Sequence, residues 1–271
     1  MPELPEVETT VRGLDPVLGG QRIARLSLHR ADLRRPFPVD LVQRMTGATI
    51  TTLSRRAKYG LIATDRGDTM IFHLGMSGRW RTDAAAREKH DHLVIETGDG
   101  RHVALNDPRR FGSVDLVAGD PLTQFAPFLA LGPEPLSAGF DAAGLVASLA
   151  GRATPIKTLL LDQRIVAGLG NIYVCEALFA AGISPLAPAG SIAPARIGPL
   201  VDAIKHVLHV AIAAGGSSLR DFVHPDGQLG YFSHKWRVYG RQGQDCGGCG
   251  RAVERVVQGG RSTFFCPTCQ H

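Results

Sequence analysis

Apolar residues recur at helical spacing at the start of the chain and again beyond residue 140. From Pro5 to Leu18 they lie three or four positions apart, and Pro5 suits the first turn of a helix. Prolines at 127, 133 and 135 interrupt the chain before the later helices. The pattern predicts helices at 5–18, 142–150, 156–162, 171–181 and 195–214, the last of which ends at Gly215-Gly216.

Between the first helix and the prolines, the pattern changes to short runs typical of β-strands. These runs are bounded by turns such as Gly98-Asp99-Gly100. Strands are predicted at 23–28, 69–74, 92–97 and 102–105. A half rich in strands followed by a half rich in helices indicates an α+β protein of two domains, with an antiparallel β-sandwich or barrel first.

Length and charge narrow the class of protein. The chain has 271 residues, 44% of them hydrophobic, which is enough for two buried cores. No run approaches the apolar length of a membrane span, and Glu3 and Glu6 lie where a signal peptide needs positive charge. We therefore expect a cytoplasmic, nucleoid-associated protein with no membrane partner. The formal charge of +5 favours a polyanionic partner only weakly, because such an excess is common on solvated surfaces.

Four of the five cysteines are crowded into the last 26 residues. They form two C-x2-C pairs with sixteen residues between them, at Cys246, Cys249, Cys266 and Cys269. This spacing predicts one structural zinc ion held by four thiolates, with strands at 252–257 and 262–265 forming the hairpin that it clamps. A pair of redox-active C-x-x-C motifs is the alternative, but such motifs need a βαβ scaffold that the tail lacks. Cys175 lies in an apolar helical stretch and is expected to be buried.

Two further segments carry candidate chemistry for nucleic-acid binding. The run 168–171, Gly-Leu-Gly-Asn, would expose backbone N–H groups at a helix start, where phosphates bind, although a Gly-rich turn between helices is more often simply a turn. The run 109–112, Arg-Arg-Phe-Gly, places two cations beside an aromatic in a loop between strands. Such a cluster can press into DNA, and an exposed arginine pair beside a packed phenylalanine is its simpler interpretation.

Together with these segments, motifs along nearly the whole chain resemble the formamidopyrimidine-DNA glycosylase (Fpg or MutM) family of base-excision repair enzymes. The motifs are MPELPEVE, RRAKYG, HLGMSG, KHDH, NDPRRFG, LGPEPL, GLGNIY, GGSSLRDF, GYF, VYGR and RSTFFCPTCQ. The resemblance implies a catalytic β-sandwich at 1–130, a helix-two-turns-helix domain at 131–235 and a zinc finger at 236–271. It also implies a monomer that holds damaged duplex DNA in a cleft between the halves.

The resemblance assigns the catalytic roles to Pro2, Glu3, Lys58 and Arg261. Removal of Met1 would leave Pro2 with a free secondary amine, the family's nucleophile, and Glu3 would move protons at the sugar. The implied activity is excision of 8-oxoguanine and formamidopyrimidines through a proline Schiff base, followed by β,δ-elimination that nicks the strand. Lys58 matches the family's lysine for that elimination. Without the resemblance, Pro2, Glu3 and Glu6 would simply favour a helix start.

Other family positions imply contacts with DNA. Phosphate contacts are implied for His73, Asn171 and Arg261. Met76, Arg109 and Phe111 match the residues that fill the space left by the extruded base, with Arg109 on the orphaned cytosine. Lys157 resembles a further basic contact, for which a solvated helix lysine is the alternative. His92, with His90, recurs in the family without a role that its chemistry explains, and Ser217–Tyr231 matches the loop over an extruded 8-oxoguanine.

Two other functions stay open on the residues alone. The related endonuclease VIII branch prefers oxidised pyrimidines, but MPELPE and the intact set of methionine, arginine and phenylalanine favour the purine branch. A non-catalytic zinc-ribbon DNA-binding protein is the alternative from another class. A blocked or extended N-terminus would favour that alternative.

Overall fold

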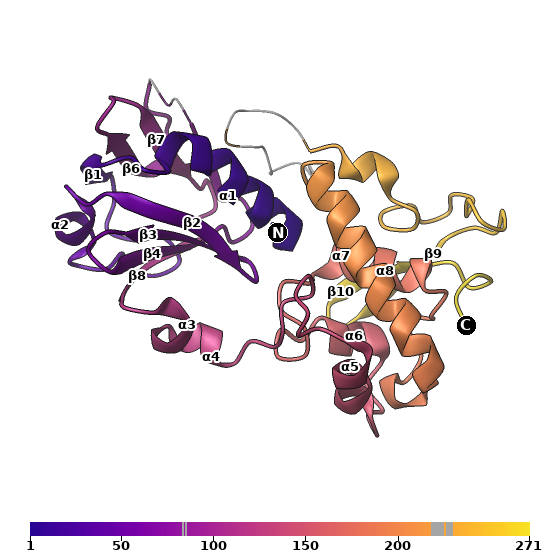
Figure 1. Cartoon of the computed structure of the whole chain (residues 1–271). Coiled ribbons are helices and arrows are strands. Elements are labelled where there is room, and N and C mark those ends of the chain that lie inside the picture. Colours follow the sequence, from indigo (N-terminus) through magenta and orange to yellow (C-terminus); the bar gives the residue numbers. More distant parts are fainter. Residues whose placement is uncertain (83, 85, 218–224, 226–229) are drawn as a thin grey trace. The chain divides into compact units, whose positions relative to one another are not determined.

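The computed structural model describes residues 1–82, 84, 86–217, 225 and 230–271, and these form two compact units (Figure 1). The first unit comprises Met1–Leu129 and Ala214–Ser233. The second comprises Ala130–Ala213 and His234–His271. In the described part of the chain, no helix has the length and apolar character needed to cross a membrane.

The first unit is a sandwich of two antiparallel four-stranded sheets. One sheet has the order β1-β6-β7-β5, with strands β1 (Ile23–Leu28), β6 (Asp91–Thr97), β7 (His102–Asn106) and β5 (Arg79–Arg81). The other has the order β2-β3-β4-β8, with strands β2 (Ile50–Arg56), β3 (Tyr59–Thr64), β4 (Asp68–His73) and β8 (Ser113–Ala118). Its helices are α1 (Leu4–Leu18), α2 (Leu41–Met45), α3 (Pro121–Gln124) and α4 (Ala126–Leu129).

Side chains from both sheets and from α1 form one core in this unit. Phe72 of β4 and Trp80 of β5 meet edge to face across the sandwich, with ring centroids 5.3 Å apart. Gly60 of β3 lies under the Phe72 ring, where a Cβ would come within 2.0 Å of a ring atom. The apolar face of α1, which includes Val7 and Leu14, covers this core and so fixes where the N-terminus lies.

The second unit is helical apart from a C-terminal hairpin. Its helices are α5 (Ala142–Leu149), α6 (Ile156–Leu160), α7 (Asn171–Ala180) and α8 (Pro194–Ala213), with a 3₁₀ turn at η1 (Ala189–Ser191). A further 3₁₀ turn, η2 (Phe232–Lys235), begins in the first unit and ends in the second. Helix α8 packs against α7 and α5. The hairpin pairs β9 (Glu254–Gln258) with β10 (Arg261–Phe265), and Gly259 and Gly260 make its turn at φ of 53° and 74°.

The structure confirms the predicted fold class, α+β with an antiparallel sandwich, a helical domain and a zinc-finger hairpin. The first helix begins one residue earlier than predicted, and the strand predicted at 23–28 is β1. Most of the lesion-covering loop expected at Ser217–Tyr231 lies outside the described residues.

Candidate active site, DNA-contacting residues and zinc centre

Two buried carboxylates, those of Glu3 and Glu6, lie at the N-terminal end of α1, shortly after Pro2 in the chain. Glu3 is 4% exposed and Glu6 is 2% exposed. Glu6 Oε2 accepts a hydrogen bond of 2.8 Å from the Glu3 amide, and Glu6 Oε1 accepts one of 2.8 Å from the Ser217 amide. Because the positive end of the helix dipole lies here, carboxylates are favoured at this point. Glu6 therefore holds the backbone beside Pro2 in place.

Lys58 lies in the tight turn between β2 and β3 and is 8% exposed. Ala57 adopts a left-handed conformation in this turn, with φ of 52°. The guanidinium of Arg55 joins the turn to α1, because it donates to Ala57 O over 2.9 Å and to Glu8 Oε2 over 3.0 Å. The sequence does not reveal this link between the lysine turn and α1.

His73 ends β4 directly opposite Tyr59 of β3, and the two rings lie 4.9 Å apart. Burial, together with the nearby cations Lys58, Arg34 and Arg35, lowers the pKa of His73 to about 4. Its Nδ1 accepts a hydrogen bond of 3.0 Å from the Gly75 amide. The neutral ring must then carry its proton on Nε2, which makes that atom a donor suited to a phosphate oxygen.

The pKa of His73 predicts a loss of stability in acid. Between pH 7 and pH 5 the unfolded chain takes up a proton at this histidine, whereas the folded chain does not. The unfolding free energy should therefore fall by about 2 kcal/mol from this group alone. His73→Gln should remove this part of the pH dependence, while the exposed control His206→Gln should leave it. Parallel denaturation profiles for the wild-type chain and His73→Gln would contradict the assignment.

Met76, Arg109 and Phe111 project from two loops of the first unit. Met76 and Phe111 are 38% and 43% exposed. The Arg109 guanidinium lies over the Phe111 ring, 4.8 Å from its centroid. The three side chains that the family resemblance groups together are thus exposed to solvent on neighbouring loops.

His92 is buried rather than open to a ligand. It is 6% exposed, and its Nε2 lies 2.9 Å from the carbonyl oxygen of Asp107. Burial lowers its pKa, and the ring of the half-buried His90 lies 6.2 Å away. His92 thus contacts the buried side of the loop that carries Arg109.

In the second unit, polar side chains converge on the turn of the zinc hairpin. Asn171, at the start of α7, donates through Nδ2 to Ser262 O over 2.9 Å and to the Tyr239 hydroxyl over 3.4 Å. Arg261, the residue before Ser262, is exposed. The Asn171 bond fixes the backbone beside Arg261, so the two candidate phosphate contacts are linked.

Lys157 of α6 is fully buried, which differs from both the surface contact and the solvated helix lysine considered from the sequence. Its Nζ donates to Thr263 Oγ1 over 2.7 Å and to Ser262 O over 3.3 Å. A buried ammonium needs such partners to offset its desolvation. Lys157 therefore acts on β10, next to Arg261.

Glu176 and Asp107 have roles that the sequence analysis did not identify. Both carboxylate oxygens of Glu176 are used, since they accept hydrogen bonds of 2.8–3.0 Å from the amides of Arg237, Val238 and Tyr239. Glu176 is the one charged residue of the apolar helix α7, which is the signal that could have revealed it. Asp107 is fully buried between the two exposed loops and had no comparable signal.

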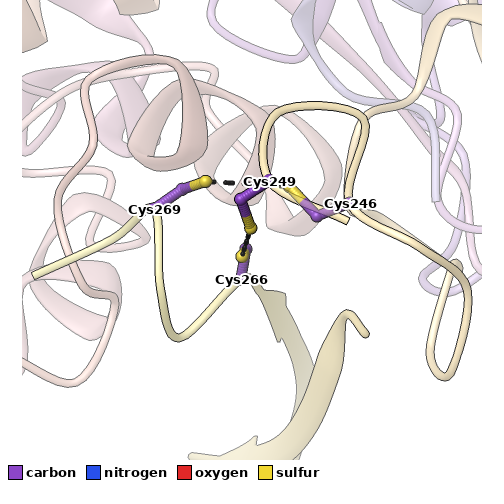
Figure 2. A group of neighbouring side chains, drawn as sticks. All are labelled: Cys246, Cys249, Cys266 and Cys269. Atoms are coloured by element: carbon purple, nitrogen blue, oxygen red, sulfur yellow. Dashed lines mark hydrogen bonds between the residues drawn. The ribbon is translucent and has the colours of Figure 1, made fainter. Parts of the chain in front are cut away.

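The four cysteines of the tail converge as predicted, and none of them forms a disulfide. Figure 2 shows their side chains pointing toward one another, and the four Sγ atoms all lie within 4.8 Å of each other. The Cys246–Cys269 and Cys249–Cys266 sulfur distances are 3.8 and 3.5 Å. Zinc–sulfur bonds of about 2.3 Å in a tetrahedron require about 3.8 Å between sulfurs, so the site fits a structural zinc ion.

Three family profiles match successive parts of the chain. The formamidopyrimidine-DNA glycosylase N-terminal domain matches residues 1–114, and the H2TH domain of the same enzymes matches 131–223. The zinc finger found in Fpg and IleRS matches 243–271. The predicted zinc centre is confirmed by this match together with the clustered thiols.

Whole proteins agree with these matches. A formamidopyrimidine-DNA glycosylase of Sphingopyxis alaskensis is 66% identical over 270 residues, with full coverage of both chains. The crystal structure of the MutM (Fpg) protein of Thermus thermophilus is 42% identical, with a TM-score of 0.89 over 99% of this chain and 98% of that one. Wild-type Lactococcus lactis Fpg, solved with N7-benzyl-Fapy-dG containing DNA, is 36% identical, with a TM-score of 0.90 over 99% of both chains. The chain belongs to the formamidopyrimidine-DNA glycosylase family.

Proposed function

We propose that this DNA glycosylase and abasic-site lyase of base excision repair acts on oxidised purines, 8-oxoguanine and formamidopyrimidines, in duplex DNA. The observation that carries the proposed chemistry is the pair of buried carboxylates, Glu3 and Glu6, that follow Pro2 at the start of α1. The Lactococcus lactis relative was solved with a Fapy-dG derivative in DNA, which supports the purine branch. The cytoplasm, at the nucleoid, is the proposed site of action.

The proposed nucleophile is the secondary amine of Pro2 after removal of Met1. An α-amino group has a pKa of about 8, against about 10.4 for a lysine side chain, so more of it is neutral at physiological pH. Its nitrogen lone pair forms a bond to C1′, and the damaged base leaves with the electrons of the glycosidic bond; the nitrogen then loses its proton, and the departing base takes one up. Glu3 then protonates O4′ as the sugar ring opens to an iminium ion.

The iminium ion serves as the electron sink for strand cleavage. Because the proline nitrogen is secondary, the iminium has no N–H to lose and stays cationic. Loss of a C2′ proton expels the 3′ phosphate, and a second elimination expels the 5′ phosphate. Lys58 is proposed to contact the phosphate and assist these eliminations, and Arg261, which stays protonated, is proposed to hold a phosphate beside the lesion by hydrogen bonds. The buried position of Lys58, beside the neutral His73, supports its role.

Other residues are proposed to hold the DNA. His73 and Asn171 contact phosphates around the lesion, and Met76, Arg109 and Phe111 occupy the space left by the extruded nucleotide. We propose that Lys157 and His92 act indirectly, by supporting Arg261 and Arg109 respectively. The proposed functional domains are 1–130, 131–235 and 236–271.

Excision rates on matched duplexes test the substrate class and the role of Arg109. Arg109 can donate to the acceptors of cytosine, whereas adenine presents a donor. The wild-type chain should therefore excise 8-oxoguanine much faster opposite cytosine than opposite adenine, by about ten- to a hundredfold. Arg109→Ala should remove most of this preference in single-turnover assays. Faster excision of an oxidised pyrimidine would favour the endonuclease VIII branch, and unchanged discrimination in Arg109→Ala would refute the role of the arginine.

A further inference from the structure

Two loops present the side chains proposed to enter the DNA, and one buried carboxylate joins them. Loop 74–78 carries Met76, and loop 107–112 carries Arg109 and Phe111. The carboxylate belongs to Asp107, which is fully buried. Its Oδ1 accepts a hydrogen bond of 2.7 Å from Ser77 Oγ in the first loop, and its Oδ2 accepts one of 2.8 Å from the Gly112 amide at the end of the second.

The Ser77 hydroxyl extends this link to Arg109. While it donates to Asp107, its oxygen accepts a hydrogen bond of 3.2 Å from the Arg109 amide. Ser77 is 6% exposed, so the amide, the hydroxyl and the carboxylate form a chain shielded from water. Chains of this kind are strong when every member is satisfied and weaken sharply when one is removed.

The backbone of Asp107 is held as firmly as its side chain. Its carbonyl oxygen accepts from the Arg110 amide over 3.3 Å and lies 2.9 Å from His92 Nε2. Its amide donates to His90 O over 3.0 Å. The Asp107 backbone is therefore fixed to the end of the sheet, and its carboxylate fixes both loops to the same place.

Close backbone packing makes the two loops depend on each other. A Cβ at Gly75, where φ is +62°, would come within 2.3 Å of the Phe111 carbonyl carbon. Arg110 also adopts a left-handed conformation, with φ of 58°, which a non-glycine residue holds only when its surroundings impose it. Neither loop can shift by much without displacing the other.

We infer that Asp107, acting through Ser77, is a positioning residue for recognition of the base opposite the lesion. This inference rests on the proposed function, and it extends it from Arg109 to the buried groups behind that residue. Asp107 itself touches no DNA in this account. It holds the Arg109 backbone in the position from which the guanidinium can reach cytosine. Small errors in the placement of a group that contacts the substrate strongly reduce the reaction rate.

The test measures single-turnover excision of 8-oxoguanine opposite cytosine and opposite adenine in Ser77→Ala and Asp107→Asn. Both variants should lower the cytosine-to-adenine ratio by on the order of tenfold, toward the ratio of Arg109→Ala. The ratio is insensitive to partial unfolding, because unfolding lowers both rates equally. Asp15→Asn, an exposed carboxylate on α1, is the matched control and should keep the wild-type ratio.

Two further measurements separate positioning from general damage. In the Arg109→Ala background, adding Asp107→Asn should leave the ratio unchanged, because the side chain that the carboxylate positions is already gone. In the DNA-free protein, amide hydrogen exchange in peptides covering 107–112 should be faster in both variants. If Asp107→Asn fails to fold, Ser77→Ala carries the same test.

The possible outcomes distinguish this inference from the proposed function. If both variants keep the cytosine-to-adenine ratio of the wild-type chain, the role of Asp107 is wrong and the proposed function is unaffected. Unchanged hydrogen exchange at 107–112 in both variants would also overturn it. A wild-type chain that shows no excision or no preference would overturn the proposed function and the inference together.

Discussion

Cys266→Ser should weaken binding to lesion-containing duplex DNA by about ten- to a hundredfold and reduce excision at least as much. The reason is that the hairpin has almost no core of its own. Its buried cluster includes Val253 and the thiols of Cys246 and Cys266, packed against Cys175 and Phe179 of α7. Binding of structural zinc supplies the folding free energy of such small elements. Without the metal, β10 should lose the geometry that places Arg261.

The size of the effect follows from the phosphate contact. One charged hydrogen bond is worth about 1.5–3 kcal/mol, which corresponds to the expected loss of affinity. The salt dependence of binding should also decrease, by about 0.9 in log–log slope for each phosphate contact removed. Fluorescence anisotropy across a salt series measures both quantities.

A matched control adds a serine to the other C-x2-C pair of the zinc site, between Cys246 and Cys249, without removing a thiolate. Gly247→Ser places a Cβ where no atom lies within 4 Å, so zinc content and DNA affinity should stay at wild-type levels. Zinc content of both variants is measured alongside affinity. A zinc-free Cys266→Ser protein with near-normal excision at physiological salt would show that the hairpin is dispensable.

An extra alanine inserted between Met1 and Pro2 should abolish excision and strand nicking, by at least about a thousandfold. The insertion turns the proline nitrogen into an amide, which has no lone pair available for attack on C1′. Binding to duplex DNA should change little, because the proposed phosphate contacts lie elsewhere in the chain. Intact mass confirms which residue begins each preparation.

Lys58→Gln provides the comparison for this prediction. It should slow elimination but retain covalent attack, so an intermediate should accumulate that the alanine insertion cannot form. Full activity of the chain with the inserted alanine would show that an amine other than Pro2 is the nucleophile. Lys58, with its own amino group, would be the first candidate.

The first helix could be predicted from the spacing of its apolar residues, which are buried, and β1 from its short run bounded by turns. Strands β2 and β3 could not be placed individually by the same reasoning. Five of the six residues of β3 are apolar or glycine, so the strand shows little alternation. The turn before it uses Ala57 in a left-handed conformation, which has no glycine or asparagine to signal it.

The zinc site was predictable from the spacing of the cysteines alone, whereas the burial of individual polar side chains was not. The family resemblance places Lys157 and His92 among the DNA-contacting positions, yet both side chains are buried and bonded to backbone or hydroxyl groups. Their environment is made by residues distant in sequence, such as Thr263 for Lys157. Asp107 was missed for the same reason, because its partner Ser77 lies thirty positions away.

The central claim, that Pro2 is the nucleophile, is tested most directly by borohydride trapping. The wild-type chain is mixed with a duplex that carries 8-oxoguanine opposite cytosine, the iminium is reduced, and the cross-linked peptide is sequenced by mass spectrometry. The account predicts a covalent complex whose cross-linked peptide begins at Pro2, with the nucleotide on the proline nitrogen. A cross-link mapped to Lys58, or no complex from a chain shown by mass to begin at Pro2, would contradict it.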